Sequence, residues 1–250
     1  MTTGNIIRYD SRPVLKSPIL IEGLPGVGNV GKIAADYMSE KLNARRIARI
    51  FSEDLPPQVM VSEESTIEMA DNELWLAEDV NGHDLVFLLG DYQGTSQQGQ
   101  FSLSETAFRM ILKHDPAMIV TLGGYGTGGI VTEPRIIAAV SDESMKPRLQ
   151  ECGVEFGPRE PAGGIVGAAA MLVGLGDMYG IDSVCIMGET SGFFHDSKSA
   201  RSVIGCVSRL LGFEIDLAGL DEAVAEIDNL NMQAQAAQSQ ETPEDLSYYG

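Results

Sequence analysis

Three uninterrupted apolar runs constrain the fold of this chain more than any other feature. They are residues 86–89 (VFLL), 118–122 (MIVTL) and 184–187 (VCIM). A strand with one face in solvent alternates apolar and polar side chains, whereas a continuous run indicates a strand covered on both faces. These runs alternate with helical patterns along the chain. The sequence therefore predicts an α/β fold with a mostly parallel sheet flanked by helices.

The same reading predicts eight strands in the body of the chain and, besides a helix that follows the first strand, three further helices. The strands are expected at residues 18–23, 46–51, 59–61, 65–69, 74–77, 85–90, 117–123 and 183–188. Residues 102–105 (SLSE) match a capping box, which predicts that a helix begins there and ends near Pro116. Residues 163–179 form a helix rich in Gly and Ala, and apolar residues spaced by three and four predict another at 200–211.

The last forty residues have a different composition. Leu220, Val224, Ile227 and Leu230 form an apolar stripe on an otherwise acidic helix, which needs a groove on its own domain or on a neighbouring subunit. Beyond it, Gln, Ala, Ser, Glu and Asp dominate, and such a composition predicts a flexible tail. We therefore expect an α/β domain at 1–212, an acidic amphipathic helical segment at 213–231, and a disordered tail at 232–250 that ends in Tyr-Tyr-Gly.

Charge and hydropathy exclude several classes of partner. The formal net charge is −19, which repels phosphate backbones and acidic membranes, so we expect no nucleic acid and no membrane among the partners. The longest apolar stretch, residues 165–176, is shorter than the roughly 20 residues that span a bilayer. The N-terminus does not resemble a signal peptide, and the three cysteines have no paired spacing. These features predict a cytoplasmic protein with basic partners.

A glycine loop follows the first predicted strand and opens a helix. Its key residues are Gly26, Gly28, Gly31 and Lys32. They satisfy Gly-x-Gly-x-x-Gly and most of the phosphate-loop pattern. Ile33 stands where a magnesium-binding hydroxyl is needed, so nucleotide hydrolysis is not expected. Dinucleotide binding stays open, since Glu53 and Asp54 follow the second strand, but glycines in a tight turn are often needed only for backbone geometry. We interpret the loop as a decoy and expect no cofactor.

No catalytic or metal-ligating constellation is apparent in the sequence. Ser191 lacks a Gly-x-Ser-x-Gly elbow, and its nearest base, His195, is expected to cap or border the next helix. His83 and His114 have no second ligand at helical spacing, so a metal site is not expected. The competing possibility is that Asp91 and the glycine-rich strand ends at 123–129 and 188–192 line a small-molecule pocket.

Four ordered blocks carry a resemblance to a known family. They are residues 23–31 (GLPGVGNVG), 89–93 (LGDYQ), 122–126 (LGGYG) and 187–192 (MGETSG). Together they are similar to the archaeal proteasome assembly chaperone family over residues 18–211. The resemblance implies a nucleoside phosphorylase/hydrolase-like architecture, a binding protein and not an enzyme, and glycine-rich strand ends that are inherited scaffold. The alternative is a small-molecule-binding enzyme of nucleoside phosphorylase/hydrolase-like or dinucleotide-binding type.

The C-terminal residues Tyr248, Tyr249 and Gly250 resemble the hydrophobic-tyrosine-any ending that proteasome activators insert between α subunits of the core particle. With the family resemblance, this ending implies an ATP-independent proteasome assembly chaperone or proteasome-binding factor that docks its tail on α subunits. One such tail binds weakly, and several tails presented together gain affinity through avidity. We therefore expect a homo-oligomer.

Overall fold

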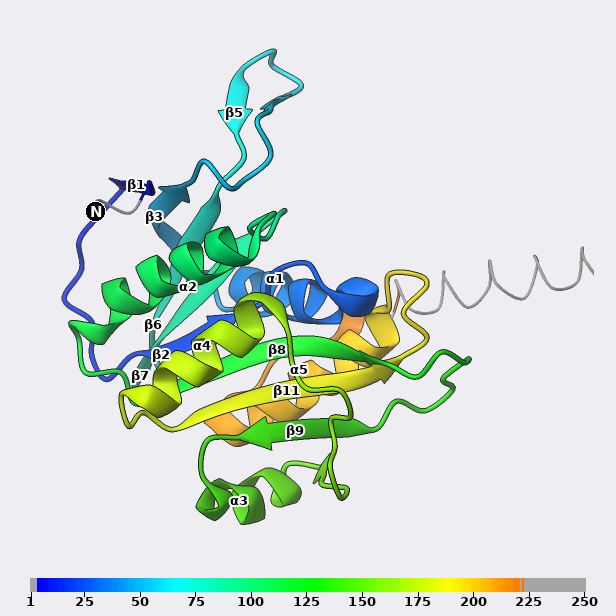
Figure 1. The fold of residues 1–250 in the computed structure, drawn as a ribbon. Helices are drawn as coiled ribbons and strands as arrows, with labels where there is room; N and C mark the ends of the chain where they lie inside the picture. The colour runs from blue at the N-terminus through cyan, green and yellow to red at the C-terminus, as the bar shows by residue number, and fades with distance from the viewer. Residues whose placement is uncertain (1–3, 221, 223–250) are drawn as a thin grey trace, which may run out of the picture. The chain divides into compact units, whose positions relative to one another are not determined.

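The computed structural model describes residues 4–220 and 222 (Figure 1). The chain divides into two units, Met1–Ile215 and Asp216–Gly250. Of the acidic helical segment predicted at 213–231, residues 213–220 and 222 are described; residues 213–217 are not helical, and residues 218–220 and 222 are. The remainder of that segment and the whole predicted tail lie outside the described residues. The boundaries predicted at residues 212 and 231 stay predictions.

The first unit is built on a nine-stranded mixed sheet. Its strands, in order across the sheet, are β1 (Ile6–Tyr9), β3 (Arg45–Phe51), β6 (Asn72–Val80), β7 (His83–Gly90), β2 (Ile19–Glu22), β8 (Met118–Gly126), β11 (Ser183–Thr190), β9 (Ile136–Val140) and β10 (Val154–Glu155). The central strands β7, β2, β8 and β11 are parallel. The pairs β1–β3, β3–β6, β6–β7 and β9–β11 are antiparallel. The β9–β10 pair at one edge is parallel as well, so the predicted mostly parallel sheet holds at the centre and at that edge, whereas the other flanking pairs are antiparallel.

Helices cover both faces of this sheet, as the continuous apolar runs predict (Figure 1). On one face lie α1 (Val30–Lys41) and α5 (Ser197–Leu211), and on the other lie α2 (Gln97–Leu112) and α4 (Gly167–Met178). The short helix α3 (Lys146–Glu151), which follows the 3-10 turn η2 (Glu143–Met145), lies beside β10. The central strands are buried almost throughout, with Leu20, Val86, Phe87 and Val120 at 0% exposure. Burial of these side chains supplies the main stabilisation of the fold.

The predicted strands are confirmed within a few residues, whereas β1, β9 and β10 were not predicted. The predicted start of the second helix is wrong. α2 begins at Gln97, because the Ser96 side chain accepts a hydrogen bond from Gly99 N at 2.9 Å. Ser102 lies one turn further on, where its carbonyl and hydroxyl oxygens each accept from Asn5 Nδ2 at 3.0 Å.

Two further strands, β4 (Val59–Val61) and β5 (Ile67–Met69), form a separate antiparallel hairpin. Figure 1 shows it projecting from the edge of the body, beyond the ends of β3 and β6. Both strands were predicted, and all six of their residues are exposed. The hairpin is therefore an appendage and contributes little to the core.

Candidate functional site

The glycine loop lies at the carboxyl ends of the central strands, and its glycines allow close backbone packing. The loop contains the 3-10 turn η1 (Val27–Asn29) and leads into α1. A Cβ atom at Gly31 would lie 2.2 Å from the carbonyl oxygen of Leu122, and one at Gly124 would lie 2.2 Å from the carbonyl oxygen of Val27. Any larger side chain at either position would push the loop away from β8. These two glycines therefore have a packing role that needs no ligand.

The polar groups of the loop are engaged within the protein. Gly28, at φ +61°, accepts a hydrogen bond from Asp196 N at 2.9 Å. Lys32 Nζ lies 2.9 Å from Asp91 Oδ1 and 3.0 Å from Asp36 Oδ2. Burial alone would lower the pKa of Lys32, but the hydrogen bonds to Asp91 and Asp36 outweigh it and raise that pKa. Lys32 is thus a cation held between two carboxylates, an arrangement that favours the decoy interpretation of the loop.

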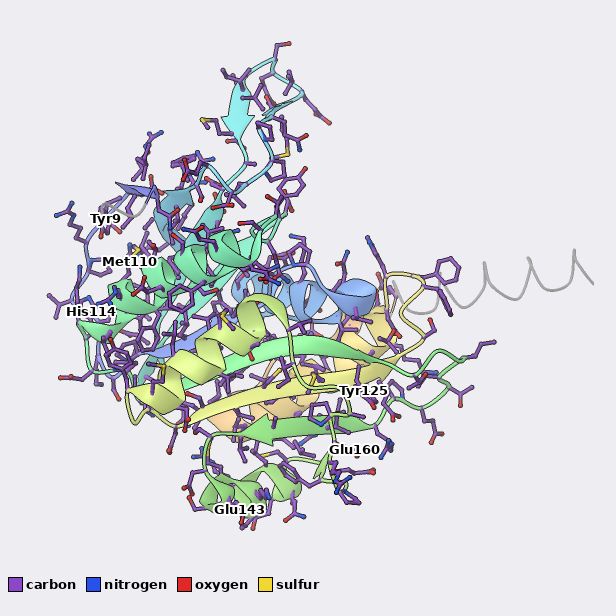
Figure 2. The ribbon with its side chains drawn as sticks, in the orientation of Figure 1. Tyr9, Met110, His114, Tyr125, Glu143 and Glu160 are labelled. Atoms are coloured by element: carbon purple, nitrogen blue, oxygen red, sulfur yellow. The ribbon has the colours of Figure 1, made fainter. Side chains whose placement is uncertain are left out.

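The candidate nucleophile and the histidines occupy separate local settings. The Ser191 hydroxyl accepts from Phe193 N at 3.4 Å, and His195 Nε2 lies 2.9 Å from Asn29 Nδ2. Asp196, not His195, caps α5 by accepting from Ser199 N. Figure 2 shows His114 beyond the end of α2, far from Tyr125 at the carboxyl end of β8. His83 Nδ1 lies 2.9 Å from the carbonyl oxygen of Ser17.

One carboxylate at the strand ends is buried. Glu22, the last residue of β2, is 1% exposed. Its Oε1 accepts from Leu24 N at 3.0 Å, while Oε2 has no hydrogen-bond partner within the described part of the chain. Burial raises the pKa of Glu22 to about 8, and the single backbone hydrogen bond offsets only part of that effect. Glu22 is therefore mostly protonated in the folded protein at neutral pH.

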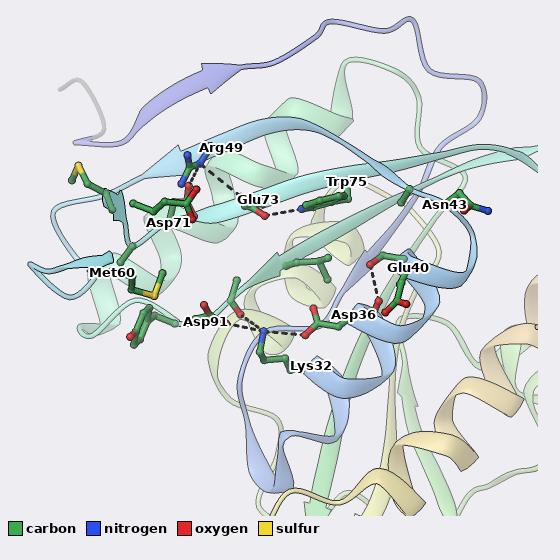
Figure 3. A pocket seen from close by; sticks show the side chains of 18 residues that line it. Lys32, Asp36, Glu40, Asn43, Arg49, Met60, Asp71, Glu73, Trp75 and Asp91 are labelled. Carbon is green, nitrogen blue, oxygen red and sulfur yellow. Dashed lines mark hydrogen bonds and ion pairs between the residues drawn. The ribbon is translucent and has the colours of Figure 1, made fainter. Parts of the chain in front are cut away.

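A polar cavity of about 660 Å³ lies between α1, the strands β3 and β6, and the base of the hairpin (Figure 3). Asp91 lines it, and Gly124 does not. The predicted pocket joining Asp91 to the glycine-rich ends of β8 and β11 stays a prediction. Apart from Lys32 and Asp91, the cavity is lined by residues that the sequence analysis did not single out.

The cavity is lined by more carboxylates than cations. Its acidic side chains are Asp36, Glu40, Glu68, Asp71, Glu73 and Asp91. Its cations are Lys32 and Arg49, and both are ion-paired: Arg49 contacts Asp71 and lies 3.7 Å from Glu73. Burial raises the pKa of Asp36 and of Asp71, and their cationic partners only partly compensate. Glu40 and Glu68 have no ion-pair partner among the described residues, so the side chains that line the cavity carry a net negative charge.

The single tryptophan of the chain also lines this cavity. Trp75 Nε1 donates to Glu73 Oε2 at 2.8 Å, which fixes the indole ring beside the carboxylates (Figure 3). Sequence reasoning missed the cavity because its residues come from segments between positions 32 and 92 that only the topology brings together. One feature of the sequence could have indicated an acidic surface: residues 50–108 contain many Asp and Glu but no Lys or Arg.

The predicted docking residues Tyr248, Tyr249 and Gly250 lie outside the described residues. Among the described residues, no group of three or more His, Cys, Asp or Glu side chains is placed to hold a metal ion. A search of the same residues for helices finds none whose length and hydropathy suit a membrane span.

Comparison with known proteins places the chain in a family. The PAC2 family matches residues 20–235. Pyrococcus furiosus PbaB, described as an archaeal proteasome activator, is 32% identical, with a TM-score of 0.87 over 94% of this chain and 100% of PbaB. Pyrococcus furiosus PbaA, described as an archaeal homolog of proteasome-assembly chaperone, is 22% identical, with a TM-score of 0.77 over 94% of this chain and 93% of PbaA, and it supports the fold.

A curated relative from Methanocaldococcus jannaschii is 31% identical over 245 residues, which covers 94% of this chain and 93% of the relative. The description of PbaB as a proteasome activator agrees with the binding protein expected from the sequence. The match over residues 20–235 confirms the resemblance seen in the four glycine-containing blocks: this chain belongs to the PAC2 family.

Proposed function

We propose that this protein is an ATP-independent, cytoplasmic proteasome-binding factor, either an assembly chaperone or an activator, that docks its C-terminus on α subunits of the core particle. The observation that carries the proposal is the likeness to PbaB over 94% of the chain, at 32% identity, joined to a sequence that ends in Tyr248, Tyr249 and Gly250. The body then serves to present the terminus, and the terminus makes the contact.

The chemistry of the last three residues suits capture by a cleft. Each tyrosine ring buries a large apolar area, and at roughly 25 cal/mol per Å² two rings contribute a few kcal/mol. The family resemblance implies that the Gly250 carboxylate pairs with a lysine in the receptor pocket. Loss of translational and side-chain freedom opposes this gain, so one terminus binds weakly. Several termini in a homo-oligomer raise the overall affinity by about 10² to 10⁴.

The glycine loop supports independence from ATP. Ile33 supplies no hydroxyl for magnesium, and Lys32, the residue that would reach the phosphates, is held by Asp36 and Asp91. Isothermal titration with magnesium and ATP is expected to give no binding heat, and a micromolar dissociation constant would contradict this part of the proposal.

Capture of purified core particle by N-terminally tagged protein tests the docking role. Tyr249→Ala and deletion of residues 248–250 are expected to abolish capture, while Ser247→Ala, a change in the same segment, is expected to preserve it. Circular dichroism verifies that the fold is intact. Undiminished capture by both tail variants would refute the proposal, and light scattering that shows a monomer would remove the avidity argument.

The small-molecule enzyme remains the rival hypothesis, and its nucleoside phosphorylase-like architecture stays a prediction. At the strand ends on which it relied, Gly124 packs against the backbone of Val27, and no observation places a ligand there. We therefore propose no second function there.

A further inference from the structure

The hairpin β4–β5 presents an exposed apolar face. Val59 pairs with Met69 and Val61 with Ile67, so these four side chains lie on one face of the hairpin. Their exposed fractions lie between 48% and 71%. Contiguous large apolar side chains on a projecting element are typical of an interaction surface.

Both edges of the hairpin are open. Within the described part of the chain, β4 and β5 pair only with one another. A two-stranded hairpin is marginally stable in water, and its unpaired backbone groups can accept a further strand. Peptide recognition by strand addition uses such an edge, with main-chain hydrogen bonds for affinity and alternate side chains for specificity.

The opposite face of the hairpin carries an acidic side chain, and the base of the hairpin, including Met69, lines the cavity. Met60 pairs with Glu68 on that face, and both residues line the cavity. Glu63 and Glu64 are exposed between the two strands. Since residues 50–108 contain no Lys or Arg, no cation of this segment neutralises them. An added strand would therefore have one face against apolar side chains and the other against carboxylates.

We propose that the hairpin and the cavity form one docking surface for an extended segment of a partner protein that alternates basic and apolar residues. The segment adds to the edge of the hairpin. Its apolar side chains pack beside Val61 and Ile67, and its Lys or Arg side chains point into the cavity toward Glu40 and Glu68. The indole ring of Trp75 offers the entering cation an aromatic face.

Charge selects this occupant over two others. A second copy that paired here through its own hairpin would place Glu63, Glu64 and Glu68 against the same three carboxylates and is repelled at this surface. The chain's own C-terminal segment carries nine Asp or Glu and no Lys or Arg over residues 210–250, so it is repelled as well. A basic segment, by contrast, is attracted before contact and is oriented by the same field. This inference concerns a surface separate from the C-terminal tyrosines, and its test needs no proteasome.

Fluorescence of Trp75 in the full-length protein provides the assay, because the chain has no other tryptophan. The probe is a peptide of eight residues that alternates arginine and valine. We expect a saturable change in emission with one peptide per chain, and affinity about tenfold lower at 300 mM than at 50 mM sodium chloride. One control peptide has arginine replaced by glutamate, and a second has the same composition in two blocks, which removes the alternation. Neither control is expected to bind.

Two double variants test separately the acidic contacts and the apolar face of the hairpin. Glu40→Gln with Glu68→Gln, and Val61→Ser with Ile67→Ser, are each expected to weaken the arginine–valine peptide about tenfold. Ile130→Ser, a change at an 85% exposed residue of another loop, is expected to leave binding unchanged. Because the substituted residues are exposed, the variants are expected to fold, and circular dichroism checks the fold of each one.

Several results would overturn the proposal. These are absence of binding, equal binding of either control peptide, and full affinity in both double variants. If the hairpin variant dissociates an oligomer without altering peptide binding, the apolar face is covered by a second copy. If deletion of residues 223–250 increases peptide affinity tenfold, the chain's own terminus occupies the surface, and the proposal is again wrong.

Discussion

Replacement of the buried Glu22 by glutamine should change how the stability of the protein depends on pH. The unfolded chain ionises this carboxyl near pH 4.5, whereas the folded protein holds its proton up to about pH 8. Between these values the folded state binds one more proton than the unfolded state, so the free energy of unfolding falls as pH rises. The stabilisation is complete below pH 4.5 and is lost as pH rises through the folded pKa.

The size of the effect follows from the pKa values. Each pH unit inside this window lowers the free energy of unfolding by about 1.4 kcal/mol, so the loss is about 3 kcal/mol by pH 7 and about 5 kcal/mol over the whole window. Glutamine does not titrate, and its side-chain oxygen can still accept from Leu24 N. The second amide hydrogen adds a donor without a partner, which shifts the stability of Glu22→Gln by an amount independent of pH.

Urea denaturation of both proteins at half-unit steps from pH 4.5 to pH 8 isolates this effect. The free energy of unfolding of Glu22→Gln minus that of the natural protein is expected to increase by about 3 kcal/mol between pH 4.5 and pH 7. All other titrating groups cancel in the difference. Two parallel curves would show that Glu22 is ionised in the folded state and that the inferred burial of a neutral carboxyl is wrong.

Three other predictions test packing, capping and burial. Gly31→Ala is expected to lower the free energy of unfolding by about 2 kcal/mol or more, since its Cβ would lie 2.2 Å from a carbonyl oxygen of β8. The control Gly26→Ala places its Cβ in open space and is expected to change the free energy of unfolding little. Urea denaturation measures both variants. Ser96→Ala should cost about 1 kcal/mol in the same assay through loss of the α2 cap, and no loss would refute the revised helix start. Burial raises the pKa of both Cys185 and Cys206 to about 12, so neither thiol should react with iodoacetamide at pH 8 until urea unfolds the protein. Mass spectrometry measures the labelling. Rapid labelling of the folded protein would contradict the burial of these thiols.

The sequence predicts the centre of this fold well because burial on two faces leaves a direct mark on composition. The strands β7, β8 and β11 are almost continuous apolar runs, and each was predicted within a few residues. β9 was missed because its residues, IIAAV, include two alanines, which are poor strand formers. The Ser-Leu-Ser-Glu pattern was misleading because it lies inside α2, where Ser102 bonds to Asn5.

The site was less predictable than the fold. The glycine loop gave a clear motif, but whether a glycine meets a phosphate or a neighbouring strand depends on packing that local sequence does not encode. The cavity joins α1 to β6 and the hairpin, and only the strand order brings Lys32, Arg49 and Trp75 to one place. Burial of Glu22 likewise depends on the helices above the sheet and leaves no local pattern.

The far end of the main sheet has a consequence for self-assembly. β10 has two residues, Val154 and Glu155, so this edge offers about 7 Å of strand at roughly 3.4 Å per residue. A ladder this short gives an incoming chain few backbone hydrogen bonds, and the exposed Glu155 opposes an identical neighbour. Fibril growth from this end of the sheet is therefore disfavoured, even though the sheet is not closed into a barrel.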